Sequence, residues 1–410
     1  MNDVHLSMAI FGGLALTLGL LSRWLKQSFI SENILALAIG IAAGPLALDL
    51  IDISEWGSQE TILQYVAQVA VAIAVMEIAL RLPKREFIDN LKPLAIMLGA
   101  IMPLMWITTG LLVWLILDLP FWLALLLGAI LTPTDPVVAS SVVTGPIASA
   151  NLPTRLRDTI WAESGANDGL AHAFVMLPIL VLASSLTGSL GNWLLTTILF
   201  EVGVGALLGA GIGYGAARLL IWAETRHTIE SEAFRTFTLA LSLTTLGIAS
   251  IARTEGLLAV FVAGVVFHMT VAAQEDDEVE PIQGAIDHFF TIPVSALIGI
   301  AIPFDAWLDL GWRAPLLIIA IIFLRRLPAL ALVSRWVDTL RTWPDVLFVG
   351  WFGPIGIAAL YYATFGLKET GHEVVWIVGS LIICSSIVIH GLTAAPLSKL
   401  YGRLAPSDSD

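Results

Sequence analysis

Apolar runs of about 20 residues recur along the whole of this 410-residue chain, and they constrain its fold more than any other feature. A helix needs about 20 mostly apolar residues to cross the hydrocarbon core of a bilayer. Only 13% of the residues are charged and 57% are hydrophobic, which is too little charge to cover the surface of a soluble domain. The chain is therefore predicted to be an all-α polytopic membrane protein.

About thirteen candidate transmembrane helices can be placed between the short polar patches. Their approximate bounds are 5–22, 31–50, 61–80, 93–117, 120–142, 159–185, 193–219, 235–252, 256–273, 285–303, 314–335, 344–365 and 374–397. Residues 1–400 are thus expected to form a single transmembrane domain, followed by a short polar tail at 401–410.

Lys and Arg residues gather in alternate loops. One set of loops and ends holds Arg23, Lys26, Arg81, Lys84, Arg85, Lys92, Arg155, Arg157, Arg218, Arg226, Arg335, Arg341, Lys399 and Arg403. The opposite set holds only Arg253, Arg313 and Lys368. Because cytoplasmic loops carry the excess of basic residues, we expect an external N-terminus and a cytoplasmic C-terminus. We expect a plasma-membrane location because the sequence shows no organelle-targeting segment. The acidic run 275–280 also falls inside, where acidic residues have little weight in this rule.

Two of the predicted spans are interrupted. The fifth carries Thr-Pro-Thr-Asp-Pro at 132–136 and the twelfth carries Gly-Pro-Ile-Gly at 353–356. Proline removes a backbone donor and clashes with the preceding turn, so both helices should break inside the membrane. Breaks seven spans apart predict six-helix inverted repeats with two crossing discontinuous helices, a pattern typical of transporters. The repeats would cover about 5–185 and 235–397, joined by a linker helix at about 193–219.

The sixth span carries a cluster of oxygen-bearing side chains in an otherwise apolar helix. Ser164, Asp168 and His172 are spaced four apart and share one helical face. Glu163 and Asn167 share the neighbouring face. Carboxylate, hydroxyl and amide oxygens are the ligands that small hard cations prefer, and charges inside a membrane usually mark ion pathways. The cluster therefore predicts a cation site, although a polar network that only fixes helix packing would use the same residues.

Asp135 and two arginines are further candidates. Asp135 precedes a proline, so it should cap the second half of the broken helix, and we expect it also to face the cavity. Arg325 and Arg326 lie in the middle of the eleventh span and need partners because arginine stays charged at any depth. We expect one of them to pair with Glu163, while the other snorkels or faces a second acid; the sequence does not select between them.

Other polar residues in apolar runs have simpler interpretations. Glu77 lies four residues before Arg81 and should pair with it. The small residues of 203–215 indicate close helix packing. Histidines inside spans are expected to serve packing, with His172 the strongest candidate for a functional role; the others are His268 and His390. Three acids near span ends are expected to be interfacial, namely Asp118, Glu201 and Glu255.

These motifs resemble the NhaP/NHE class of cation–proton antiporters. Segment 128–137 is similar to its Thr-Asp-Pro broken helix, and 163–168 to its Glu-Ser-x-x-Asn-Asp signature. Further similar segments are 152–157, 256–264 and 391–397. The resemblance implies an inverted-repeat, homodimeric antiporter that exchanges Na⁺ or Li⁺ for protons and contributes to pH homeostasis, with K⁺ as the alternative cation.

The resemblance also implies roles for individual residues. Asp168 would bind cation and proton in turn, and the cation site would include Thr134, Ser164 and Glu163. Glu163 would also pair with an arginine of the eleventh helix. Asn167 in place of a second aspartate implies electroneutral exchange. The chain departs from many relatives in having no arginine between the glycines of 353–356.

Other functional classes fit the sequence less well. A nucleic-acid partner disagrees with a net charge of −13. An intramembrane hydrolase could use Asp135 with Asp168, or Ser164 with His172, but it has no need of a second broken helix. A passive channel would be expected to show a repeated filter loop. We therefore expect a transporter that is not an enzyme and uses no cofactor.

Overall fold

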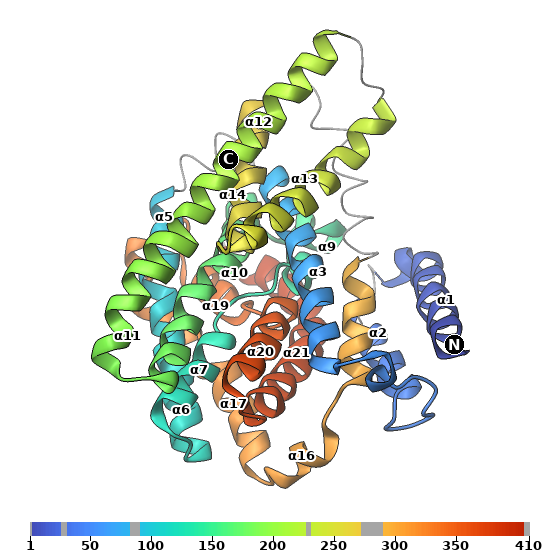
Figure 1. The fold of residues 1–410 in the computed structure, drawn as a ribbon, viewed down its shortest axis with the longest axis vertical. Coiled ribbons are helices and arrows are strands. Elements are labelled where there is room, and N and C mark those ends of the chain that lie inside the picture. The colour runs from blue at the N-terminus through green and yellow to red at the C-terminus, as the bar shows by residue number, and fades with distance from the viewer. Residues whose placement is uncertain (1, 26–30, 83–90, 227–230, 272–289, 406–410) are drawn as a thin grey trace.

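The structure is a computed structural model that describes residues 2–25, 31–82, 91–226, 231–271 and 290–405. All regular secondary structure in these ranges is helical (Figure 1), which confirms the predicted all-α class. The acidic run 275–280, the start of the tenth predicted span at 285–289 and the tail residues 406–410 lie outside the described residues.

Within the described ranges, each predicted span corresponds to one helix or to a joined set of helices. In chain order these are α1 (Asn2–Leu25), α2 (Glu32–Ala43), α3 (Gln59–Arg81), α5 (Leu91–Ile96) with η2 (Met97–Ile101) and α6 (Met102–Leu117), α7 (Phe121–Ile130) with α8 (Pro136–Val143), α10 (Thr154–Ala183), α11 (Leu186–Asn192) with η3 (Trp193–Val204) and α12 (Gly205–Thr225), α13 (Ser231–Ile251), α14 (Gly256–Thr270), the helix Phe290–Ile300, α17 (Arg313–Leu324) with α18 (Leu327–Val333), α19 (Trp343–Trp351) with α20 (Ile357–Thr370), and α21 (Val374–Leu404). Two short helices, α9 (Gly145–Asn151) and α16 (Phe304–Asp309), lie in connections. Six of the described helices are long and apolar enough to cross a membrane, by length and composition alone.

Some span boundaries differ from the prediction. The second helix ends at Ala43, because Gly44 and Pro45 follow and proline does not continue a helix. The seventh span is longer than predicted and forms one continuous helix, Leu186–Thr225, whose middle section η3 is π-helical. The last helix continues through the basic residues after 397 and ends at Leu404. Charged residues end an apolar stretch, but they do not end a helix.

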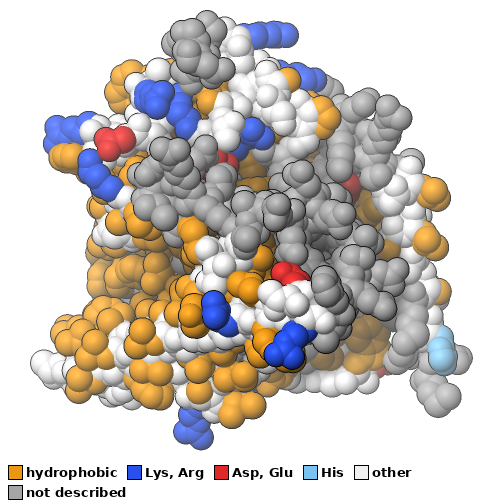
Figure 2. Space-filling view, turned by 90° about the horizontal axis from the view of Figure 1, so that it is seen from above, with side chains coloured by type: hydrophobic (Ala, Val, Ile, Leu, Met, Phe, Trp, Pro, Cys, Tyr) orange, Lys and Arg blue, Asp and Glu red, His pale blue; other side chains and the backbone are white. Residues whose placement is uncertain are grey.

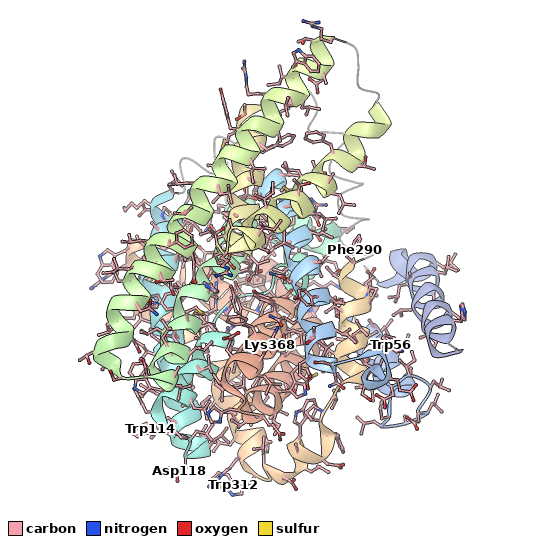
Figure 3. All side chains as sticks on the ribbon, viewed as in Figure 1. Trp56, Trp114, Asp118, Phe290, Trp312 and Lys368 are labelled. Atoms are coloured by element: carbon pink, nitrogen blue, oxygen red, sulfur yellow. The ribbon has the colours of Figure 1, made fainter. Side chains whose placement is uncertain are left out.

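The two ends of the molecule in Figure 1 differ in the residues that they carry. In Figure 1 the N-terminus lies at the lower end of α1 and the C-terminus in the upper half. Figure 3 places Trp114, Asp118 and Trp312 together at the lower end, in or beside loops predicted to be external. Viewed onto the upper end, Figure 2 shows several Lys and Arg side chains on this face. The orientation of the two ends relative to a membrane stays a prediction.

Apolar side chains remain exposed on the outer sides of the helices, as expected for a surface that meets lipid. They include Leu195, Leu199, Leu207, Leu219, Trp222, Ile319 and Leu332. A water-soluble protein would not leave such a surface uncovered.

The glycine-rich part of α12 packs directly on α14, as the sequence predicted. A Cβ atom at Gly209 would lie 2.9 Å from the Cα atom of Ala259, and one at Gly213 would lie 2.8 Å from the Cα atom of Ala263. Glycine is required at both positions because the facing atoms belong to the backbone and cannot turn away. This contact holds α14 against α12.

Gly213→Ala is therefore expected to destabilise the protein by about 1–3 kcal/mol, because the added methyl group overpacks the contact. The measurement is the midpoint of thermal unfolding in detergent. Gly211→Ala is the matched control on the same helix, where a Cβ atom meets nothing within 4 Å. The control should unfold at the wild-type temperature or slightly above it, since alanine favours helix. Equal unfolding midpoints for the two variants would contradict this packing.

Candidate functional site

The two broken spans meet at their breaks. The first break separates α7 from α8 at residues 131–135, and the second separates α19 from α20 at 352–356. The backbone N–H of Asp135 donates to the carbonyl oxygen of Pro354 at 2.8 Å, so the breaks are in direct contact. Non-helical backbone at this depth needs such partners because lipid offers none.

Asp135 caps two helices at once. Its Oδ1 accepts from the backbone N–H of Val138 at 2.8 Å in the first turn of α8. Its Oδ2 accepts from the backbone N–H of Ile357 at the start of α20. The side chain is buried, and its negative charge lies at the positive ends of two helix dipoles. The sequence predicted the cap on α8; the structure adds the cap on α20.

Arg325 donates hydrogen bonds to carbonyl oxygens at the ends of the other two half-helices, α7 and α19. Its Nη1 donates to the carbonyl oxygens of Leu131 and Thr132, at 2.5 Å and 3.2 Å, after the end of α7. Its Nη2 donates to the carbonyl oxygen of Gly353, after the end of α19. Arg325 therefore neither snorkels nor faces a second acid, because its hydrogen bonds satisfy free carbonyl groups at two negative helix ends.

The glycines of the second break leave room for these side chains. A Cβ atom at Gly353 would lie 2.9 Å from Nε of Arg326 and 3.2 Å from Nη2 of Arg325. A Cβ atom at Gly356 would lie 2.5 Å from Cγ of Asp135. The Gly-Pro-Ile-Gly motif thus lets charged groups approach the chain where its helix stops.

Glu163 forms a two-pronged ion pair with Arg326. The two nitrogen–oxygen distances are 2.6 Å for Nη1 with Oε1 and 2.5 Å for Nη2 with Oε2. Nε of Arg326 also donates to the carbonyl oxygen of Val349 at 2.9 Å. Both residues are about 2% exposed, so the pair is sealed from solvent. Of the two candidate arginines, Arg326 is the partner of Glu163.

Arg326→Ala should destabilise the protein by about 3–5 kcal/mol, because it leaves the Glu163 carboxylate buried without its cation. The check is thermal unfolding in detergent. Arg313→Ala provides the control, since Arg313 is an exposed arginine at the start of α17 and its loss should change little. Adding Glu163→Gln to Arg326→Ala should recover part of the loss. If Arg326→Ala were as stable as the wild-type protein, the pair would not stabilise the core.

A hydrogen-bonded network joins the first break to α10. Asn167 donates from Nδ2 to Oγ1 of Thr134 at 2.7 Å and accepts on Oδ1 from the backbone N–H of Thr134 at 3.2 Å. Oγ1 of Thr134 also lies 3.1 Å from Oγ of Ser164. Three of the predicted site residues are therefore in direct contact, and all three are buried.

Asp168 follows Asn167 and lies in a different environment. Its side chain is 0% exposed, and neither carboxylate oxygen has a hydrogen-bond partner among the described residues. Only its backbone is held, since the hydroxyl of Tyr362 on α20 donates to its carbonyl oxygen at 2.6 Å. A buried carboxylate without a partner is costly, so its presence indicates a group that binds something.

Sequence reasoning assigned no site role to two polar residues of α21 that support the second break. Oγ of Ser386 accepts from the backbone N–H of Ile355 at 2.7 Å. Nε2 of His390 lies 3.0 Å from the carbonyl oxygen of Trp351, and its Nδ1 lies 3.0 Å from Oγ of Ser386. Their spacing of four residues in an apolar helix was the available signal, since it places both on one face.

The minor predictions had mixed outcomes. Glu77 and Arg81 pair at 2.6 Å, as expected. The interfacial interpretation holds for the exposed Asp118 but is wrong for Glu255, which is 4% exposed. It is also wrong for Glu201, which lies inside the long seventh span with Oε2 2.9 Å from Nε2 of His172.

Comparison with known proteins places this architecture in a family. Residues 12–400 match the family model described as sodium/hydrogen exchanger, transmembrane. The chain belongs to this family. The chain is 30% identical to the Na(+)/H(+) antiporter 2 of Zygosaccharomyces rouxii, over 98% of its own length and 53% of that protein. It is also 30% identical to a Na(+)/H(+) antiporter of Schizosaccharomyces pombe, over 81% of its own length and 78% of that protein.

The fold agrees with a solved structure. The chain superimposes on the sodium proton antiporter MjNhaP1 from Methanocaldococcus jannaschii with a TM-score of 0.76, 16% identity and 98% coverage of both chains. This likeness concerns the fold. The chain spans about half the length of several curated relatives, with 53%, 57% and 43% of their lengths covered.

Proposed function

We propose that this protein moves Na⁺ or Li⁺ across the membrane in return for protons, and that Asp168 is the carboxylate which cation and proton share. The observation that carries the proposal is the bare Asp168 side chain, which is fully buried and has no partner among the described residues. Such a carboxylate is stable when it holds a proton or a cation, and strongly disfavoured when it holds neither.

Neighbouring oxygen atoms would complete the cation shell. Ser164 lies one helical turn before Asp168, and its hydroxyl contacts the hydroxyl of Thr134. Both hydroxyls, with the amide oxygen of Asn167, are hard donors of the kind that small cations accept. Glu163 gives both oxygens to Arg326, so its predicted role as a direct ligand would require that pair to open.

Competition for one carboxylate is sufficient to couple the two ions. A carrier loaded with either ion presents a neutralised Asp168 and can change its accessible side, whereas the empty, charged carrier cannot. Each turnover then exchanges one cation for one proton. Asn167 stands where a second carboxylate would add another charge, so we propose that exchange is electroneutral.

The remaining features of the transport cycle follow from the two broken helices. We propose six-helix inverted repeats around the breaks, alternating access to Asp168 and assembly as a homodimer. The N-terminus would face the outside and the C-terminus the cytoplasm of a plasma membrane, as the basic residues at the upper end in Figure 2 suggest. K⁺ is the second candidate cation, because the same oxygen donors can serve it.

The direct experiment reconstitutes the protein in liposomes that contain a pH-sensitive dye. NaCl, LiCl or KCl is added outside, with the membrane voltage clamped, at values across roughly pH 5 to 9. Na⁺ and Li⁺ should each drive proton movement that is independent of voltage. Proton movement with KCl alone would select the K⁺ alternative, and movement with none of the salts would reject antiport.

Asp168→Asn is the decisive variant in the same assay. It removes the charge but keeps the size of the side chain, so exchange should be lost, by at least about 100-fold, while the protein still folds. Asp305→Asn is its control, because Asp305 is an exposed acid on α16 and should not affect exchange. Retained exchange in Asp168→Asn would remove Asp168 from the mechanism.

A further inference from the structure

The face of α10 that carries Asp168 continues towards the start of this helix through Gly165 and Trp161. These residues are spaced three and four apart, so they lie one above the other on one side of the helix. At 1.5 Å per residue, Trp161 is about 10 Å from Asp168 along the helix axis. An ion that reaches Asp168 along this face from the start of α10 must pass both residues. The start of α10 is the end that the basic residues predict to be cytoplasmic.

Two helices that pack closely together cover this face. A Cβ atom at Gly264 on α14 would lie 2.6 Å from Cβ of Ala79 on α3, so the two helices touch. Each of them sends an apolar side chain to α10. A Cβ atom at Gly165 would lie 2.9 Å from Cγ2 of Ile78 on α3 and 2.9 Å from Cε2 of Phe261 on α14. Both side chains are buried, and together they close the face one helical turn before the candidate carboxylate.

A second layer lies one turn nearer the start of α10. Cζ of Arg81, at the end of α3, lies 5.3 Å from the ring centroid of Trp161, within the range of a cation–π interaction. Nη2 of Arg81 also lies 2.6 Å from Oε1 of Glu77, and this ion pair orients the guanidinium group. Nε1 of Trp161 is buried and has no hydrogen-bond partner among the described residues. The ring is therefore held by stacking and packing rather than by a hydrogen bond.

The contact on the other side of Asp168 is made of different atoms. A Cβ atom at Gly169 would lie 2.5 Å from the backbone nitrogen and 2.6 Å from the Cα atom of Leu258, in the first turn of α14. Backbone atoms cannot turn away, so this contact opens only when a whole helix moves. The layers over Gly165 and Trp161 consist of side chains, which can change rotamer without such a movement. The carboxylate is therefore easier to uncover from the start of α10 than from its end.

We propose that Ile78, Phe261 and the stack of Arg81 on Trp161 form a gate between Asp168 and the start of α10. This inference rests on the proposed function, because a transporter needs a gate if its site opens to one side at a time. The gate is closed in the structure. It opens when the arginine leaves the ring and the two apolar side chains turn aside. A sliding movement of α10 along α3 would break the same stack, because each helix supplies one of its partners.

The test measures how fast a small, charged thiol reagent labels Ser164→Cys in lipid nanodiscs, where the reagent reaches both faces. Ser164 lies between Trp161 and Asp168 on α10, and the only other cysteine, Cys384, is first replaced by alanine. Arg81→Gln and Trp161→Ala each remove the stack. Each should raise the labelling rate by about two- to fivefold, the size expected for one cation–π interaction. Trp161→Phe keeps an aromatic face for the arginine and should label at nearly the parent rate.

Arg226→Gln is the matched control, because Arg226 also stacks on a tryptophan, Trp222, with Cζ 5.7 Å from the ring centroid, but at the end of α12. Its labelling rate should equal that of the parent. Gly165→Ala is a second route to the same result if Trp161→Ala does not fold. Its added methyl group would push the two apolar side chains of the gate aside, so it should also speed labelling.

Unchanged or slower labelling in the folded variants would overturn the gate and would leave antiport intact. Faster labelling in the Arg226→Gln control would also overturn it, because the effect would then not depend on the contact with α10. A wild-type protein that moves no protons with any cation in the liposome assay would overturn the proposed function, and the gate with it.

Discussion

The structure depends on how the free backbone groups at two broken helices are satisfied inside an apolar interior. Four half-helices end at one place, and each end leaves unpaired N–H or carbonyl groups that lipid cannot bond. Asp135 accepts from the starts of α8 and α20, and Arg325 donates to the chain after the ends of α7 and α19. One acid and one base thereby neutralise four helix dipoles, and the backbone can remain open where an ion must bind.

This arrangement explains why the Asp168 carboxylate can lack a hydrogen-bond partner among the described residues. The charged groups at the two breaks are already committed: Glu163 and Arg326 bind each other, while Asp135 and Arg325 bind the backbone. None of them needs Asp168 as a partner. The charged groups at the breaks therefore satisfy one another or the backbone, which leaves Asp168 free for the role in ion binding that we propose. A protein that had paired Asp168 with a fixed cation would have a stable core but no reason to bind sodium.

The sequence predicted the all-α fold and the positions of the two helix breaks, because both rest on local patterns. Apolar runs predict helices, and Asp135 before a proline predicts a cap on the helix that follows it directly. Contacts between distant segments carried no such signal. The bond from Ile357 to Asp135 joins residues 222 positions apart. The adjacent arginines Arg325 and Arg326 could not be told apart, because only packing decides which faces Glu163. Glu255 was misplaced because a span end in sequence need not lie at the membrane surface.

The most direct test of the central claim measures Na⁺ binding to the purified protein by calorimetry, in buffers with different ionisation enthalpies. These data give the number of protons released for each Na⁺ bound. If cation and proton share Asp168, binding should release up to one proton and weaken by about tenfold per unit as the pH falls through the acidic range. Asp168→Asn should show neither effect. Tight Na⁺ binding that releases no proton and does not depend on pH would contradict a shared carboxylate.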